Sequence, residues 1–540
     1  MSVKESEIYK IHLSPEAKKN RIFEALRQIV LRGSELRPLV LAFENLHWID
    51  KSSEETLKKL LDSISGAQVF LIFTYRPEFV HTWGGKSYHS QVNLNRLSNR
   101  ETIKMVSHLL GTEEIDKEIE HLVLEKTEGV PFFIEELINS LRDQKIIKKK
   151  EGKYHLVKDV RKATIPSTIH DVIMARIDSL AEGAKELIQT GSVAGREFSH
   201  QLIEKVTDLL KDQLLCHLSV LRDAELLYER GIYPQSTYVF KHALTQEVAY
   251  GSLLKKKKAD LHNKIGKAIE NIYEDRLDEA CEILAYHCLK GEDWHRAYKY
   301  SQEAGLKSYS HSAYEQTIKY FEDALTALTK LPRDKMRIER EIDLRFHMRS
   351  PLVSLGRHDE WGEWIRGAEP LAREIDDDAR LANVLNYLSA LHWIHGEHLK
   401  SIELGKKALN FAEKTGHFSY QIATMTHLGI FFFNIGDYPR QIEIHQKVRK
   451  LLTGENAFKQ HGLASLPGAL SRSMLVLGMA ELGEFNKIDE IGHEALEKAE
   501  QVRNALTLAF VDNFIAVSYL SLGEFKPAIS RLENCREICH

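Results

Sequence analysis

The N-terminal fold is decided by Leu39-Val40-Leu41-Ala42-Phe43-Glu44-Asn45-Leu46-His47-Trp48-Ile49-Asp50. Five apolar residues without alternation lead into Glu44, and this pattern is typical of a strand buried on both faces in a parallel sheet. Ligands of open α/β sheets bind at the carboxyl ends of the strands. We therefore expect any chemistry of this chain to lie at Glu44 and Asn45.

The residues around this stretch predict a parallel sheet. A second apolar run covers 69–75, after a helix that Ser52 and Ser53 can cap and Gly66 ends. Strand, helix and strand with a crossover of this length form a βαβ unit, whose strands are parallel. Upstream, Ser14-Pro15-Glu16 predicts the start of a helix, because proline is favoured in the first helical turn.

The middle of the chain changes character twice. Residues 96–142 are predicted to be mostly helical, with a turn at Gly129-Val130-Pro131 that opens a new helix. Residues 148–156 resemble a small hairpin. Helical segments then run to about Leu226, followed by two short strands around a Pro/Ser turn within 226–241. Helices followed by such a hairpin are the pattern of a winged helix.

The rest of the chain repeats. Glycine followed by an acidic residue recurs at Gly396, Gly436, Gly483 and Gly523, with spacings of 40, 47 and 40 residues. An amphipathic helix precedes and follows each mark, and the longest interval has the composition of a lengthened loop. Two helices per fixed period predict an α-solenoid, since one helical hairpin cannot bury its apolar face alone.

Composition limits the classes of function. The chain has 540 residues, a net charge of −4, 43% hydrophobic and 28% charged residues, which is ordinary for a soluble protein. The near-neutral charge argues against a general nucleic-acid binder. Five cysteines without metal-ligand spacing predict reduced thiols and a cytoplasmic location. We expect no membrane association, because no N-terminal signal core and no spanning apolar run stand out.

Four motifs in order support a resemblance. They are the 44–48 stretch Glu-Asn-Leu-His-Trp, the strand end at 74–79, the turn at 129–131 with its following helix, and Phe-Lys-His-Ala-Leu at 240–244. In this order they resemble the signal-transduction ATPases with numerous domains (STAND ATPases, of the AAA type) that carry C-terminal tetratricopeptide-like repeats. Such chains occur in bacterial regulators associated with adenylate or guanylate cyclases or with kinases.

The resemblance implies an α/β plus α chain with three domains. An incomplete P-loop NTPase parallel sheet lacking the Walker A phosphate loop would occupy 1–145, and a winged-helix domain 146–255. A tetratricopeptide-like α-solenoid would occupy 256–540. No G-x-x-x-x-G-K-[ST] sequence occurs in the chain, and this loop is what cradles the phosphates of a bound nucleotide. We therefore expect the chain to be a fragment of a larger ATPase.

The resemblance also assigns roles at the end of the first strand. Glu44 would coordinate magnesium through water, against the alternative of a solvated acid at a strand end. Asn45 takes the water-activating catalytic position, where the family has an aspartate. An asparagine amide can bind water but cannot accept its proton. Hydrolysis by this chain is therefore not expected, and whether it is an enzyme stays open.

Three further residues would contact the nucleotide. Arg76 would sense the terminal phosphate, or else pair with Glu78 on the surface. Pro131 would shape the adenine pocket and also start a helix. His242 would reach a phosphate from the winged helix, or else be a packed residue. The implied cofactors are ATP or ADP with Mg²⁺ in the parent protein, and the alternative for this chain is that it binds none.

Two functions remain open at this point. The first is a regulatory nucleotide switch, in which the repeats sense a partner and an output domain outside this chain responds. The second is a protein-binding scaffold with a degenerate ATPase domain. We expect a protein partner on the concave solenoid face and possible oligomerisation through the ATPase domain. DNA binding is not expected, because the candidate recognition helix near 212–222 carries few basic residues. The lysines at 255–258 fit a solvated helix face.

Overall fold

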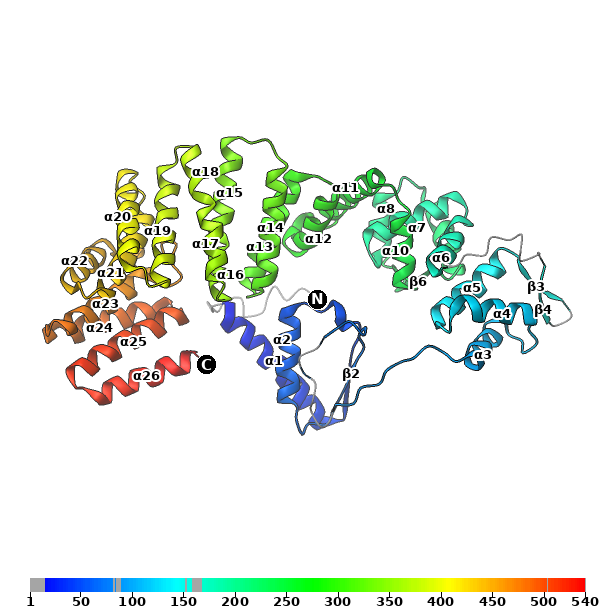
Figure 1. Ribbon diagram of the computed structural model, residues 1–540, viewed down its shortest axis with the longest axis horizontal. Helices are drawn as coiled ribbons and strands as arrows, with labels where there is room; N and C mark the ends of the chain where they lie inside the picture. Colours follow the sequence, from blue (N-terminus) through cyan, green and yellow to red (C-terminus); the bar gives the residue numbers. More distant parts are fainter. Residues whose placement is uncertain are drawn as a thin grey trace. The chain divides into compact units, whose positions relative to one another are not determined.

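The chain divides into two compact units in the computed structural model, which describes residues 15–80, 83, 89–150, 153–157, 168–502 and 504–539. One unit combines residues 1–81 with 301–540, and the other contains residues 82–300. The described chain is mostly helical, with three small sheets (Figure 1).

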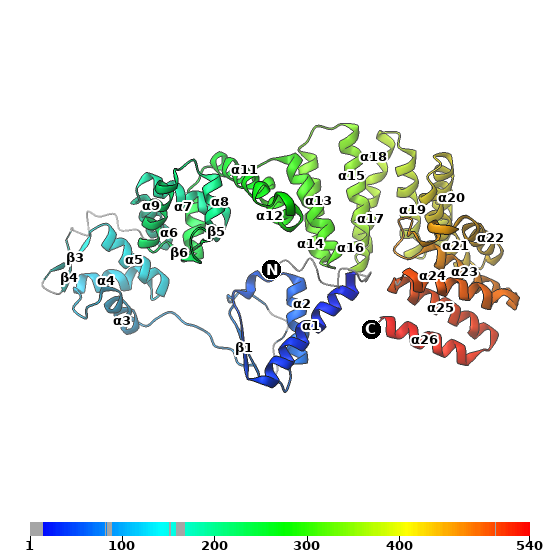
Figure 2. The same cartoon turned by 180° about the vertical axis from the view of Figure 1, so that it is seen from behind.

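The first sheet confirms the predicted parallel pair. Strand β1 (Leu39–Phe43) pairs in parallel with β2 (Val69–Phe73), and helix α2 (Lys51–Ser63) lies between them in the chain. The α2 cap is Asp50, whose side chain accepts from the Ser53 backbone N–H, so neither predicted serine is the cap. Helix α1 (Pro15–Leu36) and α2 run along the same side of the sheet (Figure 1, Figure 2).

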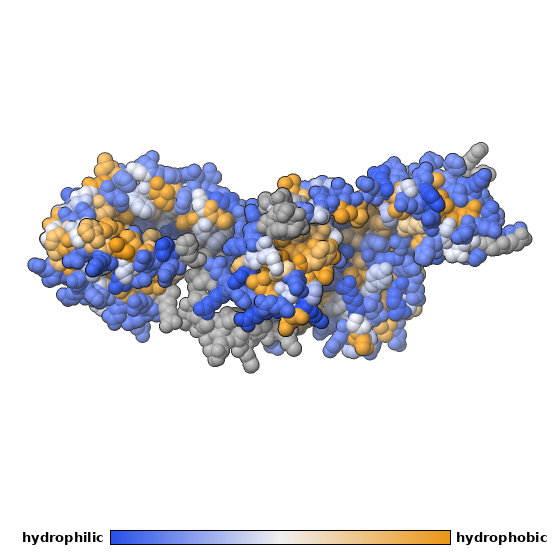
Figure 3. Space-filling model, turned by 90° about the horizontal axis from the view of Figure 1, so that it is seen from below, coloured by the Kyte–Doolittle hydropathy of each residue, from blue (hydrophilic) through white to orange (hydrophobic). Residues whose placement is uncertain are grey.

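The expectation that this strand is buried on both faces is wrong. Exposure alternates along both strands, and Val40 and Phe70 are 61% and 64% exposed. The reason is that α1 and α2 cover only one face of the sheet, so residues of the opposite pleat meet no covering layer. Figure 3 shows apolar atoms gathered over this segment, in the middle of the face drawn there.

The second unit begins with a small helical cluster. Pro131 starts a helix, as predicted, and Ile134, Leu137 and Ile138 of that helix are fully buried. The predicted hairpin is an antiparallel pair, with Ile147 opposite Leu156; residues 151 and 152 lie outside the described residues. The elements are α3 (Asn99–Leu110), α4 (Lys117–Thr127), α5 (Pro131–Asp143), β3 (Ile147–Lys150) and β4 (Lys153–Leu156).

A second cluster follows, built on a three-stranded antiparallel sheet with strand order β5-β7-β6. Its core includes Ile173, Leu187, Ile203, Leu218 and Phe240, all of them buried. The elements are α6 (Ile169–Asp178), α7 (Glu182–Ala194), β5 (Glu197–Ser199), α8 (His200–Val206), α9 (Lys211–Asp223), β6 (Leu227–Arg230), β7 (Thr237–Phe240) and α10 (Ala243–Gly251).

Helices, most of them paired as hairpins, make up most of the remainder of the described chain. They are α11 (Lys255–Ile272), α12 (Leu277–Lys290), α13 (Trp294–Ser310), α14 (Tyr314–Thr329), α15 (Lys335–His347), α16 (Arg349–Ser354), α17 (His358–Arg366), α18 (Ala368–Glu374), α19 (Asp378–Ile394), α20 (His398–Lys414), α21 (Phe418–Asn434), α22 (Tyr438–Leu451), α23 (Pro467–Glu481), α24 (Ile488–Val502), α25 (Ala505–Leu522) and α26 (Phe525–Cys539).

The predicted repeat marks are the turns inside these hairpins. Gly396, Gly436, Gly483 and Gly523 have φ angles of 77°, 77°, 76° and 77°, a left-handed conformation that glycine adopts without steric cost. Each lies between two consecutive helices, from α19 and α20 onward. The longest interval contains a lengthened loop with a 3₁₀ helix at Gly454–Phe458, as its composition predicts. The tetratricopeptide-like repeats are therefore present.

Within the repeats the two helices of a hairpin have different environments. Helices α19, α21 and α23 are buried around most of their circumference, because each packs against neighbouring hairpins as well as its own partner. Helices α20, α22 and α24 each bury one apolar stripe and expose the opposite face to solvent. Stacking of hairpins, which one hairpin alone could not provide, forms this core.

One observation corrects the expectation that no apolar run reaches the length of a bilayer. Among the described residues, α25 is long and apolar enough to cross a membrane, and about a third of it is buried. A core helix of a soluble protein passes the same test. Its single charged residue, Asp512, is buried and lies 3.2 Å from Arg531 of α26, so the helix packs within the repeats here.

Candidate functional site

The carboxyl end of β1 places Glu44 and Asn45 beside the end of β2. Asn45 has φ 59° and ψ 43°, and its backbone N–H donates to the Thr74 hydroxyl over 3.0 Å. The next N–H, of Leu46, donates to the Thr74 carbonyl over 2.9 Å. Asparagine tolerates this left-handed conformation better than most residues. Asn45 therefore has a backbone role, and the Glu44 side chain is exposed.

Arg76 lies just beyond the end of β2 and is exposed. The part of the chain that the structure describes shows no ion pair between Arg76 and Glu78, the partner that the surface alternative requires. Glu44, Asn45 and Arg76 thus follow neighbouring parallel strands at one sheet edge. A carboxylate, an amide and a guanidinium can together contact a hydrated cation and a phosphate.

The donor set at this edge limits what it can hold. Among the described residues no group of three or more His, Cys, Asp or Glu side chains is arranged to bind a metal ion. Glu44 offers a single exposed carboxylate, which fits Mg²⁺ held through its water shell, since Mg²⁺ loses water reluctantly. No glycine-rich loop is available in the sequence to surround the phosphates with N–H groups.

The other two predicted residues belong to the 82–300 unit. Pro131 begins α5, and the ring of the next residue, Phe132, lies 4.0 Å from the ring of His242 between centroids. His242 Nε2 lies 3.9 Å from a carboxylate oxygen of Glu135. Burial lowers the pKa of His242, and the nearby Glu135 offsets this only in part. A neutral imidazole facing a carboxylate can donate a hydrogen bond but is a weak anion site.

Lys241 completes this junction. Its Nζ donates to Glu135 over 2.5 Å and to Glu225 over 2.6 Å, which links α5 to the residues before β6. The carboxylates of Glu135 and Glu225 neutralise the positive charge of the Lys241 ammonium, so this charge is not available to bind a phosphate. His242 therefore lies at a polar packing junction, and its contact with a nucleotide phosphate stays a prediction.

A buried ion pair that the sequence analysis missed lies next to this junction. Arg176 of α6 donates to Glu136 of α5 over 2.7 Å, and their side chains are 3% and 2% exposed. Arg176 also donates to the Ala224 carbonyl over 2.5 Å. Burial raises the pKa of Glu136, and the charge of Arg176 offsets part of that rise. The available sequence signal was an acidic residue within an otherwise apolar helix face.

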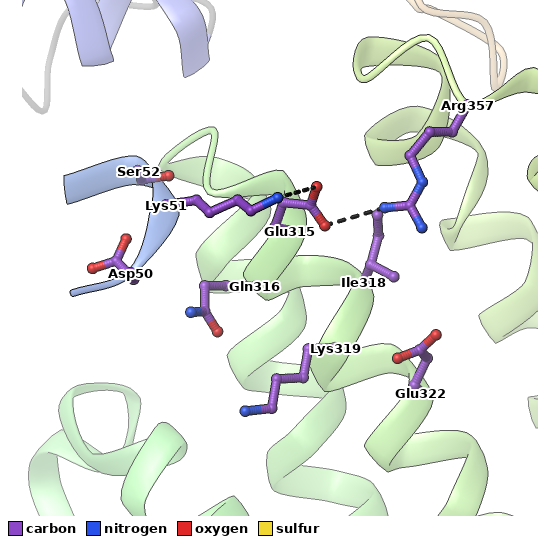
Figure 4. A pocket seen from close by; sticks show the side chains of 9 residues that line it. All are labelled: Asp50, Lys51, Ser52, Glu315, Gln316, Ile318, Lys319, Glu322 and Arg357. Atoms are coloured by element: carbon purple, nitrogen blue, oxygen red, sulfur yellow. Dashed lines mark hydrogen bonds and ion pairs between the residues drawn. The ribbon is translucent and has the colours of Figure 1, made fainter. Parts of the chain in front are cut away.

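A small cavity of about 320 Å³ lies in the unit that combines 1–81 with 301–540. Figure 4 shows the Glu315 carboxylate between Lys51, at 3.9 Å, and Arg357, at 3.1 Å. The side chains of Lys51 and Arg357 are 75% and 37% exposed, and ion pairs open to solvent contribute about 0–1 kcal/mol. This cavity therefore has no arrangement that points to chemistry.

Comparison with known proteins gives matches to parts of the chain. Residues 98–155 match the model of a domain of unknown function, DUF8739. The uncharacterized protein R02095 of Rhizobium meliloti (strain 1021) is 25% identical over 311 residues, which cover 56% of this chain and 29% of that protein. The matched region thus spans less than a third of the length of this curated relative.

Among solved structures, a STAND protein with a tetratricopeptide repeat sensor from Pyrococcus horikoshii is similar, with 14% identity, 93% and 74% of the two chains covered, and a TM-score of 0.33. Aspartyl phosphate phosphatase F from Bacillus subtilis is 12% identical, with 68% and 94% covered and a TM-score of 0.37. The Rap conjugation gene regulator of plasmid pLS20, solved with the Phr* peptide, is 12% identical, with 53% and 92% covered and a TM-score of 0.35. TM-scores this low do not transfer function.

Proposed function

We propose that this chain is a protein-binding module of a regulatory protein, in which the helical repeats hold a peptide segment of a partner. The observation that carries the proposal is the run of stacked helical hairpins from α19 to α26. Such stacks present an extended surface whose grooves recur between hairpins, and extended surfaces of this kind suit peptide segments. The proposal rests on this geometry and not on the distant structural likenesses.

The test of this proposal is a peptide selection on the full chain. A displayed library of random 12-residue peptides is selected on the immobilised chain, and single peptides are then measured by fluorescence anisotropy. We expect peptides with dissociation constants in the micromolar range that lose binding when the chain is heat-unfolded. A folded chain, by circular dichroism, that yields no such peptide would contradict the proposal.

A second candidate is the nucleotide switch of a larger STAND-type parent, supported by the edge that Glu44, Asn45 and Arg76 share. The order α7-β5-α8-α9-β6-β7 is that of a winged helix, which the family places after its ATPase domain. In the parent, Glu44 would hold Mg²⁺ through water and Arg76 would contact a phosphate. Bound Mg²⁺ would neutralise phosphate charge. A switch requires that its two states bind nucleotide differently.

For the chain itself we expect no ATP hydrolysis and at most weak nucleotide binding, because Asn45 cannot accept a proton and the phosphate loop is missing. Phosphate release is measured with the full chain and with Glu44→Ala. Robust turnover that Glu44→Ala abolishes would overturn the first expectation. Micromolar binding of a fluorescent ATP analogue that Arg76→Ala abolishes would overturn the second and favour the switch.

A further inference from the structure

A larger cavity, of about 710 Å³, lies among α22, α23 and α24 of the repeats. Leu475, Met479 and Ile491 are buried side chains in its lining. Its volume falls in the range of sites that hold a few side chains of a ligand. The cavity thus offers an apolar floor at a junction between two adjacent hairpins.

A carboxylate and two guanidinium groups are fixed in the wall of this cavity. Arg449 Nη2 lies 2.5 Å from Glu494, and Arg472 Nε lies 2.9 Å from the same carboxylate. The Arg472 side chain is only 7% exposed and also donates to the Gly468 carbonyl over 2.6 Å. Partial burial raises the pKa of Glu494, but the two arginine hydrogen bonds lower it further, so its net shift is downward. Glu494 therefore stays ionised, and the trio carries a net positive charge.

Two further cations line the same cavity. Lys450 and Lys487 are exposed, and the structure gives neither of them an ion pair with any residue that it describes. The remaining acid in the lining is Glu484, so four cationic side chains stand against two carboxylates. The two lysines are thus available to an acidic group from outside.

We infer that this cavity is the docking site for a peptide segment of a partner protein that carries an apolar side chain next to acidic ones. The apolar side chain would contact the floor at Met479, the most exposed of its three apolar residues, and the acidic groups would lie between Lys450 and Lys487. This inference rests on the proposed peptide-binding function and assigns it a place and a ligand chemistry. Complementary charge at the rim with an apolar centre is the usual plan of a protein interface.

The same features disfavour nucleic acid and free phosphate as ligands. A nucleic-acid backbone carries a charge at every nucleotide, whereas the lining offers it only two cations without an ion pair among the described residues, Lys450 and Lys487, beside the Glu484 carboxylate. A free phosphate has no apolar group that could contact Leu475, Met479 and Ile491 at the floor. A peptide uses both the floor and the rim.

The test compares the full chain with the double variant Lys450→Glu/Lys487→Glu. Peptides selected on the wild-type chain are sequenced, and their affinities for both chains are measured by fluorescence anisotropy. We expect sequences enriched in Asp or Glu beside Leu, Ile, Met or Phe, and at least tenfold weaker binding to the double variant. Raising NaCl from 0.05 to 0.5 M should also weaken binding, since salt screens exposed charges.

The matched control is Lys459→Glu/Lys526→Glu, which makes the same charge change at exposed lysines outside the cavity. It should bind the peptides as the wild-type chain does, and both variants should keep the wild-type melting curve. This site would be overturned, with the proposed function left intact, if the selected peptides lacked acidic residues. It would also be overturned if they bound the Lys450→Glu/Lys487→Glu variant as tightly as the control variant. Failure of the wild-type chain to select any peptide would overturn both. Stronger competition by tripolyphosphate or oligo-dT than by the peptides would overturn the peptide assignment.

Discussion

Nδ1 of His262 in α11 lies 2.9 Å from Nδ1 of His287 in α12, and both rings are buried. The Tyr250 hydroxyl lies 3.1 Å from the other ring nitrogen of His262. If Tyr250 donates to Nε2 of His262, then Nδ1–H of His262 donates to His287. This chain of hydrogen bonds requires both imidazoles to be neutral.

Acid should therefore loosen this pair of helices. Burial lowers the pKa of His262 to about 4, helped by Lys290 and Lys258, and burial beside His262 lowers the pKa of His287 to about 3. The unfolded chain binds these protons near pH 6.5, so stability is full above that pH and falls as pH drops toward 4. We expect the free energy of local unfolding of α11 and α12 to fall by an amount on the order of a few kcal/mol between pH 7 and 4.5. Amide hydrogen exchange in α11 and α12, corrected for intrinsic rates, measures it.

The double variant His262→Leu/His287→Leu is the control for this prediction. It should remove most of the pH dependence of exchange in α11 and α12. An unchanged pH dependence in the variant would assign the effect to other groups.

Removing one partner of the buried Arg176–Glu136 pair should be more harmful than removing both. Arg176→Met leaves the Glu136 carboxylate buried without its cation, and such losses cost about 3–5 kcal/mol. Arg176→Met/Glu136→Leu removes both charges and should be less destabilised than Arg176→Met. Hydrogen exchange in α5 and α6 reports the difference. A double variant that is as unstable as the single one would show that Arg176 acts through its other partners, the Ala224 carbonyl and the Asp143 carboxylate, which lies 3.4 Å from Arg176 Nε.

Gly129 should not tolerate a side chain. Gly129 has φ 74°, and a Cβ on it would clash with the carbonyl oxygen of Leu97. Leu97 cannot easily move away, because its own N–H donates to the Gly129 carbonyl over 2.8 Å. Gly111 has φ 66° with open space around it, so it provides a matched control. Gly111→Ala should cost about 1–2 kcal/mol from the left-handed backbone alone. Gly129→Ala should cost clearly more, and equal shifts in melting temperature would contradict the steric argument.

The left-handed conformation of Asn45 predicts a specific substitution pattern. Asn45→Gly should keep the hydrogen bonds to Thr74, because glycine adopts φ 59° freely. Asn45→Val should cost about 1–2 kcal/mol, because a β-branched residue clashes in this region. Protection of the Leu46 amide from exchange measures the effect. Equal protection in the two variants would mean that the turn can adopt another conformation.

The open face of the first sheet predicts poor solubility of residues 1–145 expressed alone. Val40, Phe70 and Ile72 are exposed on one face, and a two-stranded sheet also leaves unpaired edges. Val40→Lys/Phe70→Lys should raise the soluble fraction of this fragment, measured after centrifugation. A soluble, cooperatively melting wild-type fragment would contradict the prediction.

The local patterns of the sequence predicted much of the fold. The parallel pairing of β1 and β2 follows from the strand–helix–strand order with a long crossover. The helix start at Pro131 and the repeat turns from Gly396 to Gly523 follow from backbone preferences within a few residues. The placement of Glu44, Asn45 and Arg76 at one sheet edge also follows, because parallel strands end at the same side. Their chemical roles and the domain limits at 145 and 255 remain predictions.

By itself, then, the sequence determined the periodic elements and the order of the sites along the chain. Tertiary structure alone decided which charges meet and which faces stay open: Arg176 with Glu136, Arg472 with Glu494, and the uncovered side of β1. The physical reason is range. Strand periodicity, turn glycines and helix starts depend on neighbours a few residues away, whereas burial and ion pairing depend on segments brought together by packing.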